Sequence, residues 1–364
     1  MSAHHTHSPR PGERAASVSE QQLQEQVLDA LHGNTSLAIQ GANSKAFLGR
    51  PVTGQVLDTR VHSGIVNYDP TELVVTVRSG TPLVELFAAL EEQGQTLTCE
   101  PPTFNGQATV GGMVAAGLSG PRRPWSGAVR DLVLGTRVIT GHGKLLRFGG
   151  EVMKNVAGYD LSRLMAGSFG QLGVLTEVSM KVLPKPVCSR HLRLQLPVEK
   201  ALQKLAEWGQ QPIPITAACH IDGHLCLRLE GGIGSVRSAA DRIGGEELNA
   251  DFWEQLNEQQ LAFFQDPRPL WRLSLPPLTP ELELPGTSVL DWAGSQRWLK
   301  SDAAAEEIQA LAIRHGGHAT CYSANVTDSP FQPLAPLLER YHRQLKAQLD
   351  PQGLFNPGRQ YSAL

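Results

Sequence analysis

The stretch Gln40-Gly41-Ala42-Asn43-Ser44-Lys45 decides how this chain is interpreted, because small residues with a free backbone directly follow a short apolar strand candidate at 37–39. Gly41 and Asn43 are residue types that tolerate a positive φ, so successive N–H groups in this loop can converge on one anion. An ordinary turn uses the same residue types. The stretch alone therefore predicts either a phosphate-binding loop or a simple turn, and the rest of the sequence has to decide between them.

Two further glycine-rich stretches follow downstream. The second is Thr109-Val110-Gly111-Gly112-Met113-Val114-Ala115-Ala116-Gly117, and the third spans 167–176. Small side chains leave a surface against which a flat aromatic ligand can lie, although a tight contact between a helix and a sheet would use the same residues. The recurrence of such stretches favours a binding site assembled from separate parts of the chain.

In this order, and ending in Leu183-Pro184-Lys185-Pro186, the three stretches resemble the FAD-binding domain of the vanillyl-alcohol oxidase and p-cresol methylhydroxylase (PCMH-type) family. The resemblance covers roughly 34–186. Similarity at 154–161, Lys-Asn-Val-Ala-Gly-Tyr-Asp-Leu, and at 355–359, Phe-Asn-Pro-Gly-Arg, indicates the 2-hydroxy-acid dehydrogenase branch of that family.

This resemblance implies an α+β fold in which a PCMH-type, two-subdomain FAD-binding domain comes first. Its expected bounds are 17–186, after a disordered leader at 1–16. A smaller α+β domain is expected at 187–330, because the two prolines at 184–186 interrupt both helix and strand. A C-terminal helix and tail at 331–364 would return to the FAD domain.

The resemblance also implies the cofactor and the residues that hold it. Backbone N–H groups of the first loop would hold the FAD pyrophosphate, and this loop consists of Gln40, Gly41, Ala42, Asn43, Ser44 and Lys45. The second stretch would pass under the flavin and the pyrophosphate with Thr109, Val110, Gly111, Gly112 and Gly117. Gly173 and Val174 would meet the nucleotide through main-chain contacts. The first loop contains neither His nor Cys, so noncovalent FAD is expected.

Catalytic members of this branch carry a His-x-Gly-Asp-Gly-Asn-type segment, and this chain has Arg314-His315-Gly316-Gly317-His318 in its place. The Asp and Asn are missing. His315 and His318 are either a base or ligand pair or, beyond a helix end at Gly316, ordinary turn residues, so the catalytic residues stay unknown. The resemblance therefore favours an FAD subunit that oxidises glycolate, and in addition D-lactate, beside a larger FAD-containing catalytic subunit and an iron-sulfur subunit. A stand-alone flavin oxidase of a hydroxy acid or sugar lactone, and a non-catalytic scaffold, are the alternatives. Arg228 and Arg272 are expected on strands of the second domain, where they either clamp a carboxylate or, as is more common for single arginines on strands, contact solvent.

The composition of the chain limits the kinds of partner and the location that we expect. The chain has 364 residues, 41% of them hydrophobic, and a formal net charge of -3. This charge gives no electrostatic reason to expect a nucleic acid or a strongly anionic membrane as the partner. No apolar run reaches 18 residues and the N-terminus is polar, so we expect a cytoplasmic protein whose membrane contact, if any, is peripheral and made through its partners.

Several other classes of site are disfavoured. No G-x-G-x-x-G follows a strand candidate, and no P-loop sequence occurs. The five cysteines form no C-x-x-C pair, which argues against an iron-sulfur or zinc site in this chain. Cys219, His220, His224 and Cys226 flank an Asp222-Gly223 turn, and we expect a hairpin that pairs Cys219 with Cys226 and binds no metal.

Hydrophobic periodicity and turn residues predict the elements in outline. In the first part, helices are predicted at 17–32, 82–93 and 161–165, and strands at 37–39, 55–58, 65–68, 73–78, 131–140, 144–148 and 173–183. In the second part, helices are predicted at 198–209, 235–243, 301–315 and 331–349, and strands at 191–196, 215–229, 271–275, 288–292 and 319–323. Arg122 and Arg123 are expected to face either phosphate or solvent.

Overall fold

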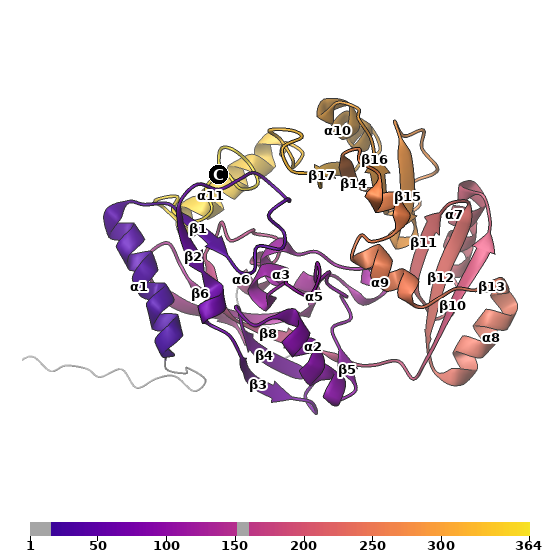
Figure 1. The fold of residues 1–364 in the computed structure, drawn as a ribbon, viewed down its shortest axis with the longest axis horizontal. Coiled ribbons are helices and arrows are strands. Elements are labelled where there is room, and N and C mark those ends of the chain that lie inside the picture. Colours follow the sequence, from indigo (N-terminus) through magenta and orange to yellow (C-terminus); the bar gives the residue numbers. More distant parts are fainter. Residues whose placement is uncertain (1–15, 151–159) are drawn as a thin grey trace, which may run out of the picture.

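The computed structural model describes residues 16–150 and 160–364. It confirms the predicted α+β class: helices alternate with mainly antiparallel sheets, and two large sheets dominate the molecule (Figure 1). The stretch 154–159, on which part of the family resemblance rests, lies outside the described residues. Within the described residues, no helix is both long enough and apolar enough to cross a membrane.

The chain begins with helix α1, Val18–Gly33, followed by a parallel pair of strands, β1 (Leu37–Gln40) and β2 (Gln55–Asp58). The Ser17 side chain accepts a hydrogen bond from the backbone N–H of Glu20, which satisfies one of the free donors at the helix start. Gly33 was expected to stop this helix, but the left-handed residue is Asn34, with φ 47°. Asn tolerates this conformation because its short polar side chain costs little there.

A five-stranded antiparallel sheet follows, in the order β3-β4-β8-β6-β7. Its strands are β3 (Ile65–Asp69), β4 (Val74–Arg78), β6 (Val133–Ile139), β7 (Leu145–Gly149) and β8 (Val174–Lys181). The segment 131–140 was predicted as one strand, but its first two residues belong to the short helix α5, Val129–Leu132. The small pair β5 (Gln95–Thr96) and β9 (Leu183–Pro184) lies at the edge of this region.

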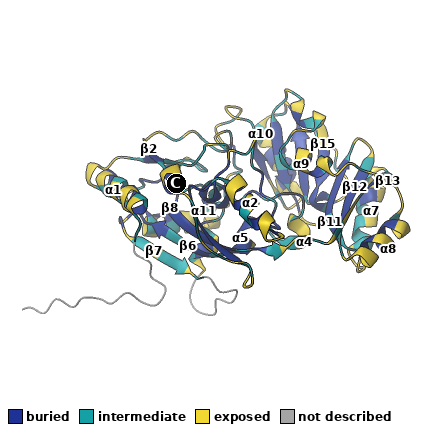
Figure 2. Cartoon of the chain, turned by 60° about the horizontal axis from the view of Figure 1, so that its bottom comes forward, coloured by how far each residue is buried: buried dark blue, intermediate teal, exposed yellow. Residues whose placement is uncertain are grey.

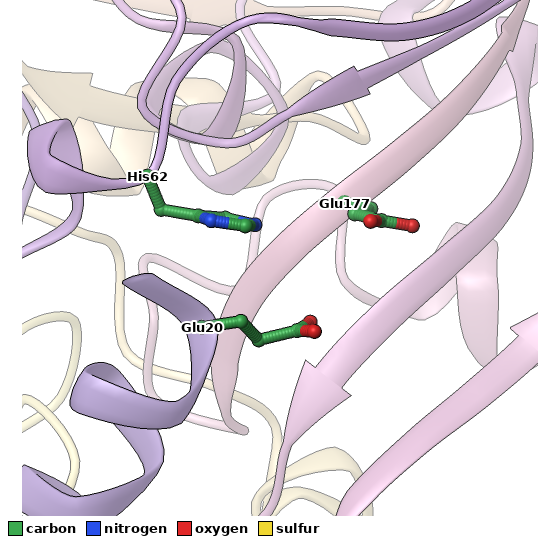
Figure 3. Close-up of side chains that lie close together, drawn as sticks. All are labelled: Glu20, His62 and Glu177. Carbon is green, nitrogen blue, oxygen red and sulfur yellow. The ribbon is translucent and has the colours of Figure 1, made fainter. Parts of the chain in front are cut away.

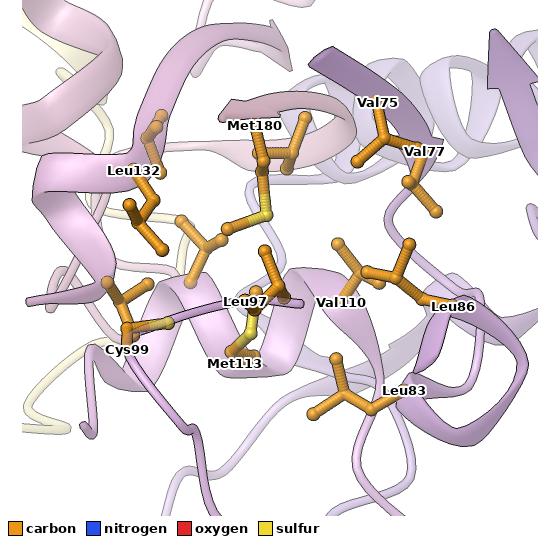
Figure 4. Close-up of a cluster of buried hydrophobic side chains, with 14 of the residues drawn as sticks. Val75, Val77, Leu83, Leu86, Leu97, Cys99, Val110, Met113, Leu132 and Met180 are labelled. Atoms are coloured by element: carbon orange, nitrogen blue, oxygen red, sulfur yellow. The ribbon is translucent and has the colours of Figure 1, made fainter. Parts of the chain in front are cut away.

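Helices α2 (Leu83–Glu92) and α3 (Val110–Ala116) pack on one face of the five-stranded sheet. Figure 4 shows their apolar side chains meeting those of the sheet, including Val75, Met113 and Met180. The second glycine-rich stretch was expected to form a flat surface, but most of it forms the helix α3. Two short helices, α4 (Arg123–Ser126) and α6 (Leu161–Leu164), complete this part.

The second large sheet has eight antiparallel strands in the order β13-β10-β12-β11-β15-β16-β14-β17. Their bounds are β10 (Cys188–Gln195), β11 (Ile215–Ile221), β12 (His224–Gly231), β13 (Glu246–Glu247), β14 (Leu270–Ser274), β15 (Thr287–Asp291), β16 (Gln296–Lys300) and β17 (His318–Cys321). The Asp222-Gly223 hairpin is confirmed, with Cys219 opposite Cys226.

One face of this sheet is covered by its own helices, and the other packs against the part of the chain that precedes the sheet. The covering helices are α7 (Val198–Trp208), α8 (Ile233–Ile243) and α10 (Ala305–Arg314). On the opposite face, side chains such as Cys219 and Trp298 share an apolar cluster with Leu48 and Leu118. Helix α9 (Asp251–Asn257) joins the same cluster through Trp253 and was not predicted. Figure 2 shows the buried strands enclosed by helices whose outer sides are exposed.

The chain enters this second sheet at Cys188, directly after β9, and we propose the domain boundary at 186 on that basis. The C-terminal helix α11 spans Pro336–Leu349, so the predicted helix is confirmed but begins five residues later than expected. Its apolar side chains contribute little to the core: Leu337 is 60% exposed and Tyr341 is 56% exposed.

Candidate functional site

The first loop, 40–45, lines a cavity of about 330 Å³ at the carboxyl end of β1. All six of its residues contribute to the wall, together with Thr109 and Gly112 from the second glycine-rich stretch. The structure thus brings the first two predicted stretches together. Asn43 has φ 57°, as expected, whereas Gly41 has no positive φ, so that part of the prediction is wrong.

Position 41 has no room for a side chain, so it requires glycine. A Cβ on this residue would lie 2.3 Å from Oγ1 of Thr109 and 3.2 Å from its Cγ2. Thr109 cannot move freely, because its hydroxyl accepts a hydrogen bond from the N–H of Gly112 at 3.3 Å and caps α3. The first loop and the start of α3 therefore touch through a contact that only glycine permits.

The third glycine-rich stretch closes a smaller recess beside the same cavity. Gly111 and Gly173 line this recess, and Gly41 and Gly112 belong to both walls. The remaining predicted residues line neither space: Val110 and Val174 are fully buried in apolar clusters. Gly117 ends α3 with φ 65° and packs closely on Gly167.

The C-terminal tail supplies a fourth part of the wall. The Asn356 side chain accepts a hydrogen bond from the N–H of Ile39 at 2.7 Å and donates one to the carbonyl of Phe169 at 2.7 Å. Arg359 donates to the carbonyls of Lys45 and Arg50. Neither Asn356 nor Arg359 was chosen as a site residue, although the tail motif that contains them had been recognised.

The charges around the cavity suit an anion. Among the described residues, its lining includes two cationic side chains, Lys45 and Arg359, and no acidic one. Burial lowers the pKa of the Lys45 ammonium to about 8, while Glu258 acts in the opposite direction. A bound phosphate group would favour the charged form of Lys45 and be stabilised by it.

Two of the arginines predicted to face solvent or phosphate, Arg122 and Arg228, form ion pairs within the protein instead. Arg228 is only 8% exposed and bonds to Glu100 at 2.7 Å and to Glu230 at 3.1 Å. Arg122 pairs with the same two carboxylates, so two positive and two negative groups join the segment that contains Glu100 and Arg122 to β12. Arg123 lies over the ring of Trp292 and is exposed to solvent, which is one of its two expected environments. These contacts join residues on either side of the predicted domain boundary, so neither part of the sequence could predict them alone.

The histidines considered for catalysis lie away from this cavity. His315 caps the end of α10, and His318 is the first residue of β17. Neither lines the cavity or its recess. Within the described residues, the structure gives no support for a general base or a ligand pair formed by these two side chains.

A buried polar cluster lies under α1, on the far side of the sheet from α2 and α3. Figure 3 shows Glu20, His62 and Glu177 converging, and the His62 ring nitrogen Nε2 has no hydrogen-bond partner. Arg137 binds Glu20 at 3.1 Å. Arg78 stands opposite Glu177 on the neighbouring strand. Two guanidinium groups already balance the two carboxylates, so we assign no metal to this cluster.

Comparison with known proteins identifies the class of protein to which this chain belongs. Residues 15–149 match the model of the FAD-binding domain family described as "FAD binding domain". A solved structure of alkyldihydroxyacetonephosphate synthase aligns with a TM-score of 0.66 over 93% of this chain and 74% of that chain, at 15% sequence identity, which shows a shared fold. The chain is thus an FAD-binding protein of the PCMH-type fold.

A full-length relative narrows this class to one family. The chain is 62% identical over 344 residues to the glycolate oxidase subunit GlcE of Escherichia coli (strain K12), covering 94% of this chain and 98% of that protein. It belongs to the GlcE family of glycolate oxidase subunits. It is also 35% identical over 139 residues to the glycolate oxidase subunit GlcD of Bacillus subtilis (strain 168), and 39% identical over 122 residues to a D-lactate dehydrogenase of Anaerostipes hadrus. These two matches cover 38% and 34% of this chain, and only 29% and 25% of those proteins.

The residues present fit FAD. The cavity combines a glycine contact that leaves the backbone accessible, two cationic side chains and a wall without acidic groups. Neither the cavity nor the recess has a His or Cys among its lining residues. Noncovalent attachment, which the first loop suggested, stays a prediction.

Proposed function

We propose that this chain is the FAD-carrying GlcE-type subunit of a glycolate oxidase, which oxidises glycolate, and in addition D-lactate, to the 2-oxo acid. The observation that carries the proposal is the match to a GlcE subunit over almost the whole of both chains, together with a cavity built at the expected loops. When bound, FAD supplies the acceptor for the two electrons removed from the hydroxy acid.

In this proposal the chain's own residues bind and orient the cofactor. Residues 40–45 hold the pyrophosphate through backbone N–H groups, and Lys45 and Arg359 neutralise its charge. Gly111, Gly112 and Gly173 keep the adjoining recess open. Asn356 holds the strand that precedes the first loop close to the third glycine-rich stretch, because its side chain bonds to the backbone at Ile39 and at Phe169.

The partners we propose are a larger FAD-containing catalytic subunit and an iron-sulfur subunit, at the cytoplasmic side of the membrane. Two observations support a subunit role. The His315 to His318 segment lies outside the cavity, and helix α11 exposes Leu337, Leu338 and Tyr341. Exposed apolar side chains grouped on one helix mark a surface that another chain can cover.

Dye reduction by glycolate tests the proposal. The FAD-loaded chain alone should reduce the dye slowly, and addition of the co-expressed partner subunits should restore the rate. General base work is worth on the order of 10² to 10⁴ in rate, so the difference should be of that size. Rapid bleaching of the flavin by glycolate in the isolated chain would support a stand-alone dehydrogenase instead. A chain that retains no flavin after reconstitution would support the scaffold alternative.

A further inference from the structure

The loop 103–106 lies between a side chain of the proposed FAD cavity and a second, larger cavity. The larger cavity has a volume of about 720 Å³ and is enclosed by α2, the segment 95–106 and α9. Three residues of the loop belong to its wall: Thr103, Asn105 and Gly106. Phe104 does not, and its ring centre lies 5.1 Å from the ammonium of Lys45, which lines the FAD cavity. The conformation of this loop therefore affects the FAD cavity.

The backbone of this loop is strained. Three consecutive residues have a positive φ, which is 48° at Phe104, 63° at Asn105 and 73° at Gly106. Asn and Gly tolerate this conformation, but a bulky residue such as Phe rarely adopts it. A strained conformation persists only where the surrounding structure holds it, and such conformations are common at ligand-binding sites. The contacts that hold the loop therefore decide where the Phe104 ring lies.

Glu258 holds this loop from the other side of the proposed domain boundary. It ends α9, which lies between the two large sheets (Figure 1). Its Oε1 accepts hydrogen bonds from the N–H of Thr103 at 2.6 Å and from the Thr103 hydroxyl at 3.0 Å. The same hydroxyl accepts a hydrogen bond from the N–H of Gly106 at 3.2 Å. Phe47 packs edge-on against Phe104, with ring centres 5.4 Å apart. One carboxylate thus connects to both ends of the loop.

Glu258 also acts on Lys45 electrostatically. Burial lowers the pKa of the Lys45 ammonium to about 8, and the negative charge of Glu258 acts in the opposite direction. The second carboxylate oxygen of Glu258, Oε2, is enclosed and has no hydrogen-bond partner among the described residues. An enclosed carboxylate oxygen without a donor is costly, so a nearby ammonium group stabilises it. Arg359, whose guanidinium donates to the Lys45 carbonyl, is a further charged group close to Lys45.

We propose that Glu258 is a positioning residue for FAD, which holds Phe104 in place and puts a negative charge beside Lys45 at the FAD cavity. The inference rests on the proposed function, in which residues 40–45 hold the FAD pyrophosphate. Glu258 itself does not line the FAD cavity, so it acts through Thr103 and Lys45. The hold on the cofactor therefore depends on a residue from the second part of the chain.

Fluorescence titration of the full-length apoprotein with FAD tests the proposal. Glu258→Ala removes both the hydrogen bonds to Thr103 and the charge, and should weaken FAD binding by about ten- to a hundredfold, the range for a hydrogen bond to a charged group. Glu258→Gln keeps an acceptor for Thr103 but removes the charge, so it should recover part of this affinity at pH 6.5. The matched control is Glu254→Gln, on the same helix and in the wall of the same larger cavity, which should bind FAD as the wild type does.

The pH profile separates this role from a merely structural one. A bound phosphate group favours the charged form of Lys45, so FAD affinity should fall as the pH rises above about 8, where the free protein loses this proton. Without the charge of Glu258 the pKa of Lys45 is lower, so the fall should begin at a lower pH in Glu258→Gln. Lys45→Met should remove the fall, and adding Glu258→Gln to it should not change the profile further. Glu254→Gln should keep the wild-type profile.

Wild-type affinity and an unchanged pH profile in both Glu258 variants overturn the proposal. Weaker binding with an unchanged profile overturns it as well, because Glu258 would then be only structural. If Glu258→Ala does not fold, as judged by circular dichroism, the profile of Glu258→Gln decides alone. Turnover of glycolate with the partner subunits is measured separately. Turnover with an unresponsive Glu258 leaves the proposed function standing, whereas FAD binding that responds to Glu258 without turnover leaves this inference standing. A wild-type chain that binds no FAD contradicts both.

Discussion

Gly41→Ala should weaken FAD binding through a contact within the protein. The new Cβ would lie 2.3 Å from Thr109 Oγ1, whereas ordinary contacts begin at 3.4 Å, so Thr109 must move by about 1 Å. That movement breaks the cap on α3, which costs about 1 kcal/mol, and forcing a methyl group into a filled space costs about 1–3 kcal/mol.

The two costs together are about 2–4 kcal/mol. If bound FAD requires the original position of α3, its dissociation constant should rise by a factor of roughly 30 to 700, since 1.4 kcal/mol is about tenfold. Fluorescence titration of the apoprotein with FAD measures this. Gly234→Ala on α8 is the matched control, because its Cβ would meet no atom within 4 Å and its backbone is helical. This control should leave FAD affinity unchanged.

A double-mutant cycle isolates the cause. Thr109→Ala removes the clashing atoms and the cap together, so Gly41→Ala added to Thr109→Ala should cost little more than Thr109→Ala alone. Additive effects of the two substitutions would show that the methyl group acts elsewhere, for instance on the ligand itself. Wild-type affinity in Gly41→Ala would refute the placement of the cofactor.

Three further outcomes are expected. Acid precipitation should release the flavin into the supernatant, because neither wall of the site contains His or Cys, and flavin on the pellet would contradict noncovalent binding. Burial lowers the pKa of His62 to about 4, so the folded protein binds fewer protons than the unfolded chain between pH 6.5 and 4, and its free energy of unfolding should fall by up to ~3 kcal/mol over that range. Urea unfolding at pH 4.5 and 7 measures this: in His62→Gln, the free energy of unfolding should change less between the two pH values. An unchanged difference would show that other groups cause the pH dependence. Glu substitutions at Leu337 and Leu338 on α11 should abolish co-purification with the partner subunits, whereas Ile313→Glu on α10, where the side chain is 58% exposed, should not; equal yields from both variants would place the interface elsewhere.

Features set by neighbouring residues were predictable from the sequence. Ser17 begins α1, and the Asp222-Gly223 turn fixes the pairing of Cys219 with Cys226, because both depend on residues close in the chain. The family resemblance assigned the first loop and Thr109 to the same cofactor, but the direct contact between them was not predicted. Nothing local to Gly41 indicates which side chain will approach it.

Strand β16 shows why other elements escaped prediction. Its sequence, Gln-Arg-Trp-Leu-Lys, has no alternating apolar pattern, yet all five residues are buried. Gln296 binds Asp291, Arg297 binds two backbone carbonyls, and Lys300 donates to the carbonyls of Asp266 and Arg268. Polar side chains can be buried when each finds a partner, and those partners are invisible to a pattern based on hydrophobicity.

The tail residue Asn356 accounts for how distant segments form one site. Its side chain is 6% exposed and bonds to the backbone at Ile39 and at Phe169, two positions separated by 130 residues of chain. An Asn side chain offers one acceptor and one donor group, and here the acceptor serves the strand before the first loop while the donor serves the third loop. Arg359 adds bonds to Lys45 and Arg50 on the other side of that loop. The last residues of the chain therefore hold the proposed FAD cavity in shape, and a site formed mainly by the first half of the sequence depends on the end of it.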